Sequence, residues 1–206
     1  MRTAARATFA GLMLLLGGCQ TWAPSTPASP QQAERAWQAQ QTRLRAIEEF
    51  GLQGRAADGR GVKADVLWQQ HGDGRFDLRL SGPFGVGAVV IRGRADQIEI
   101  QTRAGRHQTD DPEGWMRSHL GWTFPVQGLR YWILGLPAPD RDAQLSLDAQ
   151  GRLADLSQDG WTLTYSEYQT VDAIDLPRRL EAAQGERRLR LFIDRWDNPG
   201  ATPATQ

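Results

Sequence analysis

The side chains that most often carry catalysis are few in this chain, and their spacing forms no familiar catalytic pattern. The three histidines, His71, His107 and His119, match neither a metal-ligand spacing nor a nucleophile–base pair. The sequence contains no Gly-Lys-Ser or Gly-x-Gly-x-x-Gly phosphate loop and no Gly-x-Ser-x-Gly nucleophile elbow. Asp111, in the pair Asp110-Asp111, is better explained as a helix cap. We therefore expect a binding protein and not an enzyme, with neither a metal ion nor another cofactor.

Cys19 is the only cysteine, and it ends the run Leu14-Leu15-Leu16-Gly17-Gly18-Cys19, behind a start that carries Arg2 and Arg6 and no acidic residue. A basic start, a short apolar stretch and small residues before a break are typical of a bacterial export signal. Leu-Gly-Gly-Cys resembles the lipobox of bacterial lipoproteins, which implies cleavage before Cys19 and a lipid on its sulfur. Gln20 stands where an Asp commonly retains lipoproteins in the inner membrane. The resemblance therefore implies an anchor in the outer membrane, facing the periplasm; an ordinary signal beside a buried cysteine is the alternative.

Composition divides the 206 residues into four expected segments. These are a signal peptide over 1–18, the lipidated Cys19 with a flexible tether rich in Pro, Ser, Thr and Ala over 19–29, one domain over 30–197 and a disordered tail over 198–206. Removing the signal takes two of the 24 basic residues and none of the 24 acidic ones. The remaining chain is slightly acidic, which argues against nucleic acid as a partner because such partners are usually strongly basic.

Hydrophobic spacing predicts one long helix and then a change to strands. Ser29-Pro30-Gln31-Gln32 has the residues of a capping box with Pro at the first helical position. Apolar residues keep helical spacing as far as Phe50, before Gly51, which predicts a helix over about 30–49. From Leu52 the period becomes two, which is typical of half-buried antiparallel strands. The clearest strand patterns cover 62–69, 76–80, 86–91, 98–102, 145–147, 161–165 and 189–193.

Two short apolar helices interrupt the predicted strands. Asp111-Pro112-Glu113 opens the first, and the second begins at Pro125 and ends before Pro137. A long sheet of short antiparallel strands with one amphipathic and two apolar helices indicates an α+β domain. We expect a curled sheet or open barrel with helices closing one side.

An unusual loop lies between two of the predicted strands. Ser81-Gly82-Pro83-Phe84-Gly85 places a large aromatic side chain at the tip of a Gly/Pro turn, where polar residues are the rule. Phe84 either folds back onto the core or stays exposed and probes a membrane.

Several blocks of sequence together resemble the LolB family, outer-membrane lipoproteins that receive other lipoproteins and insert them into that membrane. The blocks follow the order of the family from the lipobox almost to the end of the domain: Leu67-Trp68-Gln69-Gln70, Gly82-Pro83-Phe84-Gly85, Gly121-Trp122-Thr123-Phe124-Pro125-Val126, Leu129-Arg130-Tyr131-Trp132-Ile133-Leu134-Gly135-Leu136-Pro137, Gly160-Trp161-Thr162-Leu163-Thr164-Tyr165 and Ile193-Asp194-Arg195-Trp196. The resemblance implies an incomplete antiparallel β-barrel of about eleven strands, with a three-helix lid over a hydrophobic cavity.

The resemblance also implies a mechanism and its residues. The cavity would accept the acyl chains of lipoprotein cargo from a LolA-type carrier. The loop at Pro83, Phe84 and Gly85 would deliver that cargo into the bilayer, with Phe84 where the family usually has Leu. The candidate acyl-chain residues come from strand faces and the inner helix, and packed core is the alternative for each: Trp68, Phe76, Leu78, Trp132, Ile133, Leu136, Trp161 and Tyr165.

We expect a monomer whose partners are the carrier, the cargo and the outer membrane. Two other functions stay open on the sequence. The first is a lipid-anchored structural or interaction protein with a solid barrel and no cavity. The second is a periplasmic hydrolase with an unrecognised site.

Overall fold

A computed structural model describes residues 29–82, 87–94, 97–120 and 126–200. Cys19 and nearly all of the predicted tether lie outside the described residues, as do Pro83, Phe84 and Gly85. Of the predicted tail over 198–206, the structure describes 198–200, where Pro199 is buried. Within the described ranges, no helix is both long enough and apolar enough to span a membrane.

Helix α1 (Pro30–Arg45) begins with the predicted capping box, in which the Ser29 side chain accepts from the Gln32 backbone N–H and the Gln32 side chain accepts from the Ser29 N–H. The helix is four residues shorter than the expected 30–49. Ile47 and Phe50 keep helical spacing in the sequence, but both reach the core from a non-helical segment and from the first residue of β1. The spacing of three between Leu44, Ile47 and Phe50 therefore does not require a helix, because the chain leaves the helix after Arg45 and still buries both later side chains.

Eleven antiparallel strands form one sheet in the order β6-β5-β4-β3-β2-β1-β11-β10-β9-β8-β7. The first strand, β1, pairs with the last strand, β11, in the middle of the sheet. The strands β6 and β7 form the two free edges, so the sheet is open. The prediction of an incomplete antiparallel barrel with about eleven strands is confirmed. The strands are β1 (Phe50–Asp58), β2 (Lys63–Gln70), β3 (Phe76–Ser81), β4 (Val89–Arg94), β5 (Gln97–Thr102), β6 (Gly105–Thr109), β7 (Ala143–Leu147), β8 (Leu153–Gln158), β9 (Trp161–Val171), β10 (Ile174–Gln184) and β11 (Arg187–Asp197).

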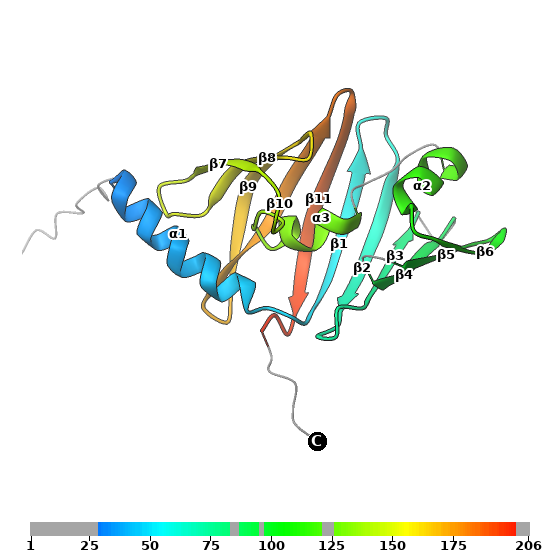
Figure 1. The fold of residues 1–206 in the computed structure, drawn as a ribbon, viewed down its shortest axis with the longest axis horizontal. Coiled ribbons are helices and arrows are strands. Elements are labelled where there is room, and N and C mark those ends of the chain that lie inside the picture. Colours follow the sequence, from blue (N-terminus) through cyan, green and yellow to red (C-terminus); the bar gives the residue numbers. More distant parts are fainter. Residues whose placement is uncertain (1–28, 83–86, 95–96, 121–125, 201–206) are drawn as a thin grey trace, which may run out of the picture.

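The helices lie against the curved sheet, with α3 (Val126–Ile133) across its central strands and α1 and α2 (Pro112–Leu120) toward opposite ends (Figure 1). Gln40 of α1 donates to the Asp175 carbonyl at 2.7 Å, which fixes α1 to β10. The turn between β7 and β8 also contacts α1 closely. A Cβ at Gly151, where φ is +74°, would clash with the Ala33 carbonyl oxygen, so this contact requires glycine.

One hydrophobic core spans both halves of the sheet. The inward side chains alternate along the strands, as Val66, Trp68 and Gln70 do on β2. Phe50 joins the halves, since its ring lies 5.5 Å from that of Trp196 on β11 and 6.2 Å from that of Trp68. Burying each such side chain contributes about 1.5–3 kcal/mol, so this cluster is a main source of stability.

Candidate functional site

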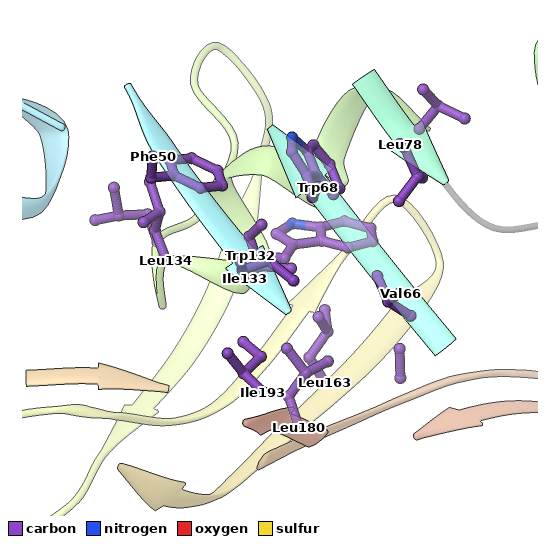
Figure 2. Packing of buried hydrophobic residues seen from close by; sticks show 14 of the residues in the cluster. Phe50, Val66, Trp68, Leu78, Trp132, Ile133, Leu134, Leu163, Leu180 and Ile193 are labelled. Carbon is purple, nitrogen blue, oxygen red and sulfur yellow. The ribbon is translucent and has the colours of Figure 1, made fainter. Parts of the chain in front are cut away.

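A cavity of about 130 Å³ lies between α3 and the central strands. Its wall is almost entirely carbon, because the strands turn aliphatic and aromatic side chains inward and α3 places its apolar face above them. Figure 2 shows Trp132 and Ile133 of α3 facing Val66 and Trp68 of β2. A space with this lining can hold hydrocarbon and offers nothing to a polar ligand.

Three alanines on inward strand positions, Ala56, Ala64 and Ala182, stand in the wall. Ala56 of β1 is paired with Ala64 of β2. Small side chains on adjacent strands leave room that Leu or Phe would fill, and interiors are otherwise closely packed. These alanines therefore help to produce the cavity.

The predicted acyl-chain residues fall into two groups of four. Trp68, Leu78, Trp132 and Ile133 line the cavity. The other four are buried but lie outside its lining, where two of them support it: the Phe76 ring lies 5.7 Å from that of Trp68 and the Trp161 ring 6.4 Å from that of Trp132. This second group is Phe76, Leu136, Trp161 and Tyr165. Sequence reasoning missed lining residues that share the inward period of two, such as Leu163, Leu180, Leu189 and Leu191.

The C-terminal end of α3 is fixed by buried hydrogen bonds to β8 and β9. Gln158 is 3% exposed, and its Oε1 accepts from the Trp132 Nε1–H at 2.9 Å and from the Ala138 N–H at 2.8 Å. Its Nε2 donates to the Ala138 carbonyl at 3.0 Å and to the Arg141 carbonyl at 3.3 Å. The Tyr165 hydroxyl donates to the Trp132 carbonyl at 2.8 Å, and burial raises the pKa of Tyr165 well above its ordinary value, which keeps the hydroxyl protonated. Trp132 is thus held in one orientation over the cavity.

Replacing Gln158 with Leu should destabilise the protein by at least about 2 kcal/mol, because it leaves several buried polar groups without partners at about 1–3 kcal/mol each. The free energy of unfolding from urea titration measures this. Gln144→Leu, at an exposed position on β7, is the matched control and should change stability by less than about 0.5 kcal/mol. Equal losses in the two variants would contradict the role given to Gln158.

The N-terminal end of α3 is tied to α2, and Arg130 in its last turn is tied to the chain before β1. The Glu113 carboxylate of α2 accepts a hydrogen bond from the backbone N–H of Val126, the first residue of α3. Burial raises the pKa of Glu113, and the bond from Val126 opposes that rise. Arg130 donates to the Ile47 carbonyl at 3.3 Å. Asp111 caps α2 as predicted, accepting from the Gly114 N–H at 2.8 Å. The two short helices therefore form one connected cover over the sheet.

The cavity reaches the surface at the end of the central strands where β1 turns into β2. Val62, in that turn, lines the cavity and is 56% exposed. Ser81 at the end of β3 pairs with Asp65 near the start of β2, and Val89 at the start of β4 pairs with Leu80. The chain over 82–88 therefore leaves and rejoins the sheet at the strand ends that surround the cavity mouth. The predicted delivery residues 83–85 belong to this connection.

Comparison with known proteins identifies the family. Residues 48–196 match the family model described as outer membrane lipoprotein LolB. The chain belongs to the LolB family. It is 35% identical to the outer-membrane lipoprotein LolB of Chromohalobacter salexigens, over 90% of this chain and 86% of that one, and 38% identical to that of Nitrosococcus oceani, over 89% and 92%. The family resemblance inferred from the sequence blocks is confirmed.

A solved structure supports the fold of this LolB-family chain at the level of architecture alone. A DUF1329 family protein from Desulfovibrio piger superposes with a TM-score of 0.53 at 8% sequence identity, covering 83% of this chain and 95% of that one. The open sheet with helices on one side is thus shared with a protein of nearly unrelated sequence.

The histidines of this LolB-family chain are less scattered than the sequence indicates. The Trp115 ring of α2 stacks on His119 at 4.5 Å and on His107 of β6 at 5.4 Å, which fastens α2 to an edge strand. His71 contacts the Asp77 carboxylate through Nε2 at 3.0 Å. The described ranges contain no group of three or more His, Cys, Asp or Glu side chains that could hold a metal ion. The contacts of these histidines are therefore packing against Trp115 and a contact with one carboxylate.

Proposed function

We propose that this LolB-family protein accepts lipoproteins from a LolA-type periplasmic carrier, holds their acyl chains in the cavity and inserts them into the outer membrane. The observation that carries the proposal is a cavity lined almost entirely by carbon that opens at the strand ends from which the 82–88 connection leaves. The names of the relatives, outer-membrane lipoprotein LolB, support the same conclusion. The protein acts as a monomer and serves trafficking, without a chemical step on its cargo.

The energetics require no catalysis and no nucleotide. Each acyl CH₂ exposed to water costs about 0.8 kcal/mol, so a lipoprotein crossing the periplasm unprotected would face a barrier of tens of kcal/mol. A cavity removes most of that barrier. A difference of about 1.4 kcal/mol between the cavities of carrier and receptor already shifts the exchange tenfold. A better apolar fit is therefore sufficient to drive transfer.

The cavity must expand to hold its cargo. Its volume of about 130 Å³ is smaller than that of typical ligand pockets, which measure about 300–1,000 Å³. The cover formed by α2 and α3 is the moving part in this proposal, because α3 lies directly over the cavity. Loading moves α3 away from the sheet and enlarges the space under it.

Cys19 is the anchor in this proposal. Cleavage before it and lipidation of its sulfur would leave the domain over 30–197 attached to the outer membrane through the 19–29 tether. Delivery then takes place beside the membrane that receives the cargo. Residues 83–85, with Phe84 at the tip, make the contact with the bilayer.

A hydrophobic fluorescent probe separates this proposal from the anchored interaction protein with a solid barrel. The chain beginning at Gln20 retains every described helix and strand. We expect it to bind anilinonaphthalene sulfonate at one saturable site, with the probe displaced by a long-chain fatty acid, while cooperative thermal unfolding shows that the domain is folded. A folded domain that leaves the probe unbound would favour the solid barrel.

A further inference from the structure

The turn between β1 and β2 presents an exposed apolar side chain at the cavity mouth. Val62 is 56% exposed, more than either of the other two large exposed hydrophobic residues that the structure describes, Leu67 and Leu145. The turn is well ordered by its own hydrogen bonds. The Asp58 carboxylate accepts from the Arg60 N–H at 2.9 Å and from the Val62 N–H at 2.7 Å. Val62 therefore stands in a defined turn at the cavity mouth.

Basic residues lie close to Val62 in the sequence and on the adjacent strand. Arg60 and Lys63 flank it in the turn, and the Gly59 N–H donates to the Arg188 carbonyl at 3.0 Å, which brings the start of β11 alongside. The two segments 58–63 and 181–190 together carry five basic and three acidic residues: Arg60, Lys63, Arg187, Arg188 and Arg190, against Asp58, Glu181 and Glu186.

The ion pairs beside the cavity mouth neutralise only part of the positive charge. Arg188 and Arg190 both pair with Glu181, at 3.5 and 3.9 Å. Within the described ranges, Arg60, Lys63 and Arg187 form no ion pair, although Arg187 donates to the Gln184 side chain at 3.3 Å. All three side chains are exposed. The mouth therefore has uncompensated positive charge beside an apolar tip.

We propose that this mouth rim, defined as Arg60, Val62, Lys63 and Arg187, docks on the headgroups of anionic phospholipids. A small apolar tip among cations is the pattern of an interfacial membrane contact, in which the apolar group enters the boundary and each Lys or Arg near an anionic surface contributes about 1 kcal/mol. Protein interfaces are enriched in aromatic residues, Met and Arg and depleted in Lys; the rim has two Arg residues but no aromatic residue and no Met, and it contains Lys63. Docking turns the cavity mouth and the base of the 82–88 connection toward the bilayer.

The tether keeps the start of α1 close to the membrane. From Cys19 to Ser29 the chain can span at most about 35 Å, at 3.3–3.6 Å per residue. The helix α1, to which the tether leads, lies at one end of the sheet (Figure 1). The reach of the tether therefore limits the domain to positions close to the membrane. Rim docking is a property of the folded domain, and it does not depend on which cargo the cavity takes.

The test is sedimentation of the chain beginning at Gln20 with vesicles of phosphatidylethanolamine and phosphatidylglycerol in equal parts. We expect binding at low salt that is lost at high salt and with phosphatidylcholine vesicles. Arg60→Glu/Lys63→Glu should weaken binding by about tenfold or more, and Val62→Ser by a smaller factor. The charge-matched control is Arg45→Glu/Arg75→Glu, at exposed positions at the end of α1 and in the β2–β3 turn, which lies at the opposite end of β2 from the rim; it should change binding by less than about twofold.

Three results would overturn the proposal, provided that thermal unfolding shows every variant to be folded. They are no binding of the parent chain to anionic vesicles, equal losses in the rim and control variants, and unchanged vesicle binding by a rim variant that no longer takes cargo from the carrier. The last result would make the rim a protein-docking surface. If the parent chain binds vesicles but takes no cargo from the carrier, that result would instead count against the proposed function.

Discussion

Replacing Phe84 with Glu is expected to stop delivery of cargo into the outer membrane while leaving the fold and the acceptance of cargo intact. A charged side chain at the centre of a bilayer costs at least about 2.5–3.5 kcal/mol, which corresponds to a loss of roughly a hundredfold in insertion. The measurement is the rate at which a labelled lipoprotein passes from the loaded protein into vesicles. Thermal unfolding and loading from the carrier provide the parallel readouts for fold and acceptance.

Phe84→Leu is the matched control for this experiment. It keeps an apolar side chain and introduces the Leu that the family resemblance implies at this position, so delivery should continue. Normal delivery by Phe84→Glu would remove the role assigned to the 83–85 segment, even though the strand ends on both sides of it lie at the cavity mouth.

Replacing Ala64 with Phe should reduce cargo acceptance by about tenfold or more, because the added ring occupies the cavity that the acyl chains require. Ala64 is half-buried in β2 and faces Ala56 across the strand pair. Filling an existing space with apolar atoms should preserve stability, whereas overpacking a dense core costs about 1–3 kcal/mol. The amount of labelled cargo retained after mixing with loaded carrier measures acceptance.

Ala143→Phe on β7 is the control, since Ala143 is exposed and outside the cavity lining. It should leave both acceptance and stability close to those of the parent. If Ala64→Phe folds normally and still accepts cargo at the parental level, the acyl chains bind elsewhere and the cavity is incidental.

Most of the fold can be predicted from the sequence. Each strand that the sequence does not mark clearly departs from the period of two for a physical reason. β6 is exposed at an edge and has no buried face, so no apolar alternation marks it. β10 contains Pro177, and its register with β9 shifts on both sides of Arg179, which interrupts the period of two. In β8, Leu153 and Leu156 are both buried at a spacing of three, because the pairing with β7 is irregular there.

The lining residues that follow the apolar period of a strand or helix could be predicted from the sequence. The positions where small side chains leave the cavity unfilled could not. Trp68 and Leu78 lie on inward strand positions, and Trp132 and Ile133 lie on the apolar face of α3. The alanines that leave room for the cavity look like ordinary strand residues in the sequence. Gln158 shares the inward face with Leu156, but only the three-dimensional arrangement shows that it meets Trp132.

The most direct test of the central claim is to mix the chain beginning at Gln20 with a LolA-type carrier loaded with a labelled lipoprotein, separate the two proteins and determine which one holds the label. The account predicts that the label moves to this chain, that Ala64→Phe prevents the move and that Ala143→Phe does not. Label that stays on a carrier able to load another LolB-family receptor would contradict the account, and the anchored interaction protein would then be the better description.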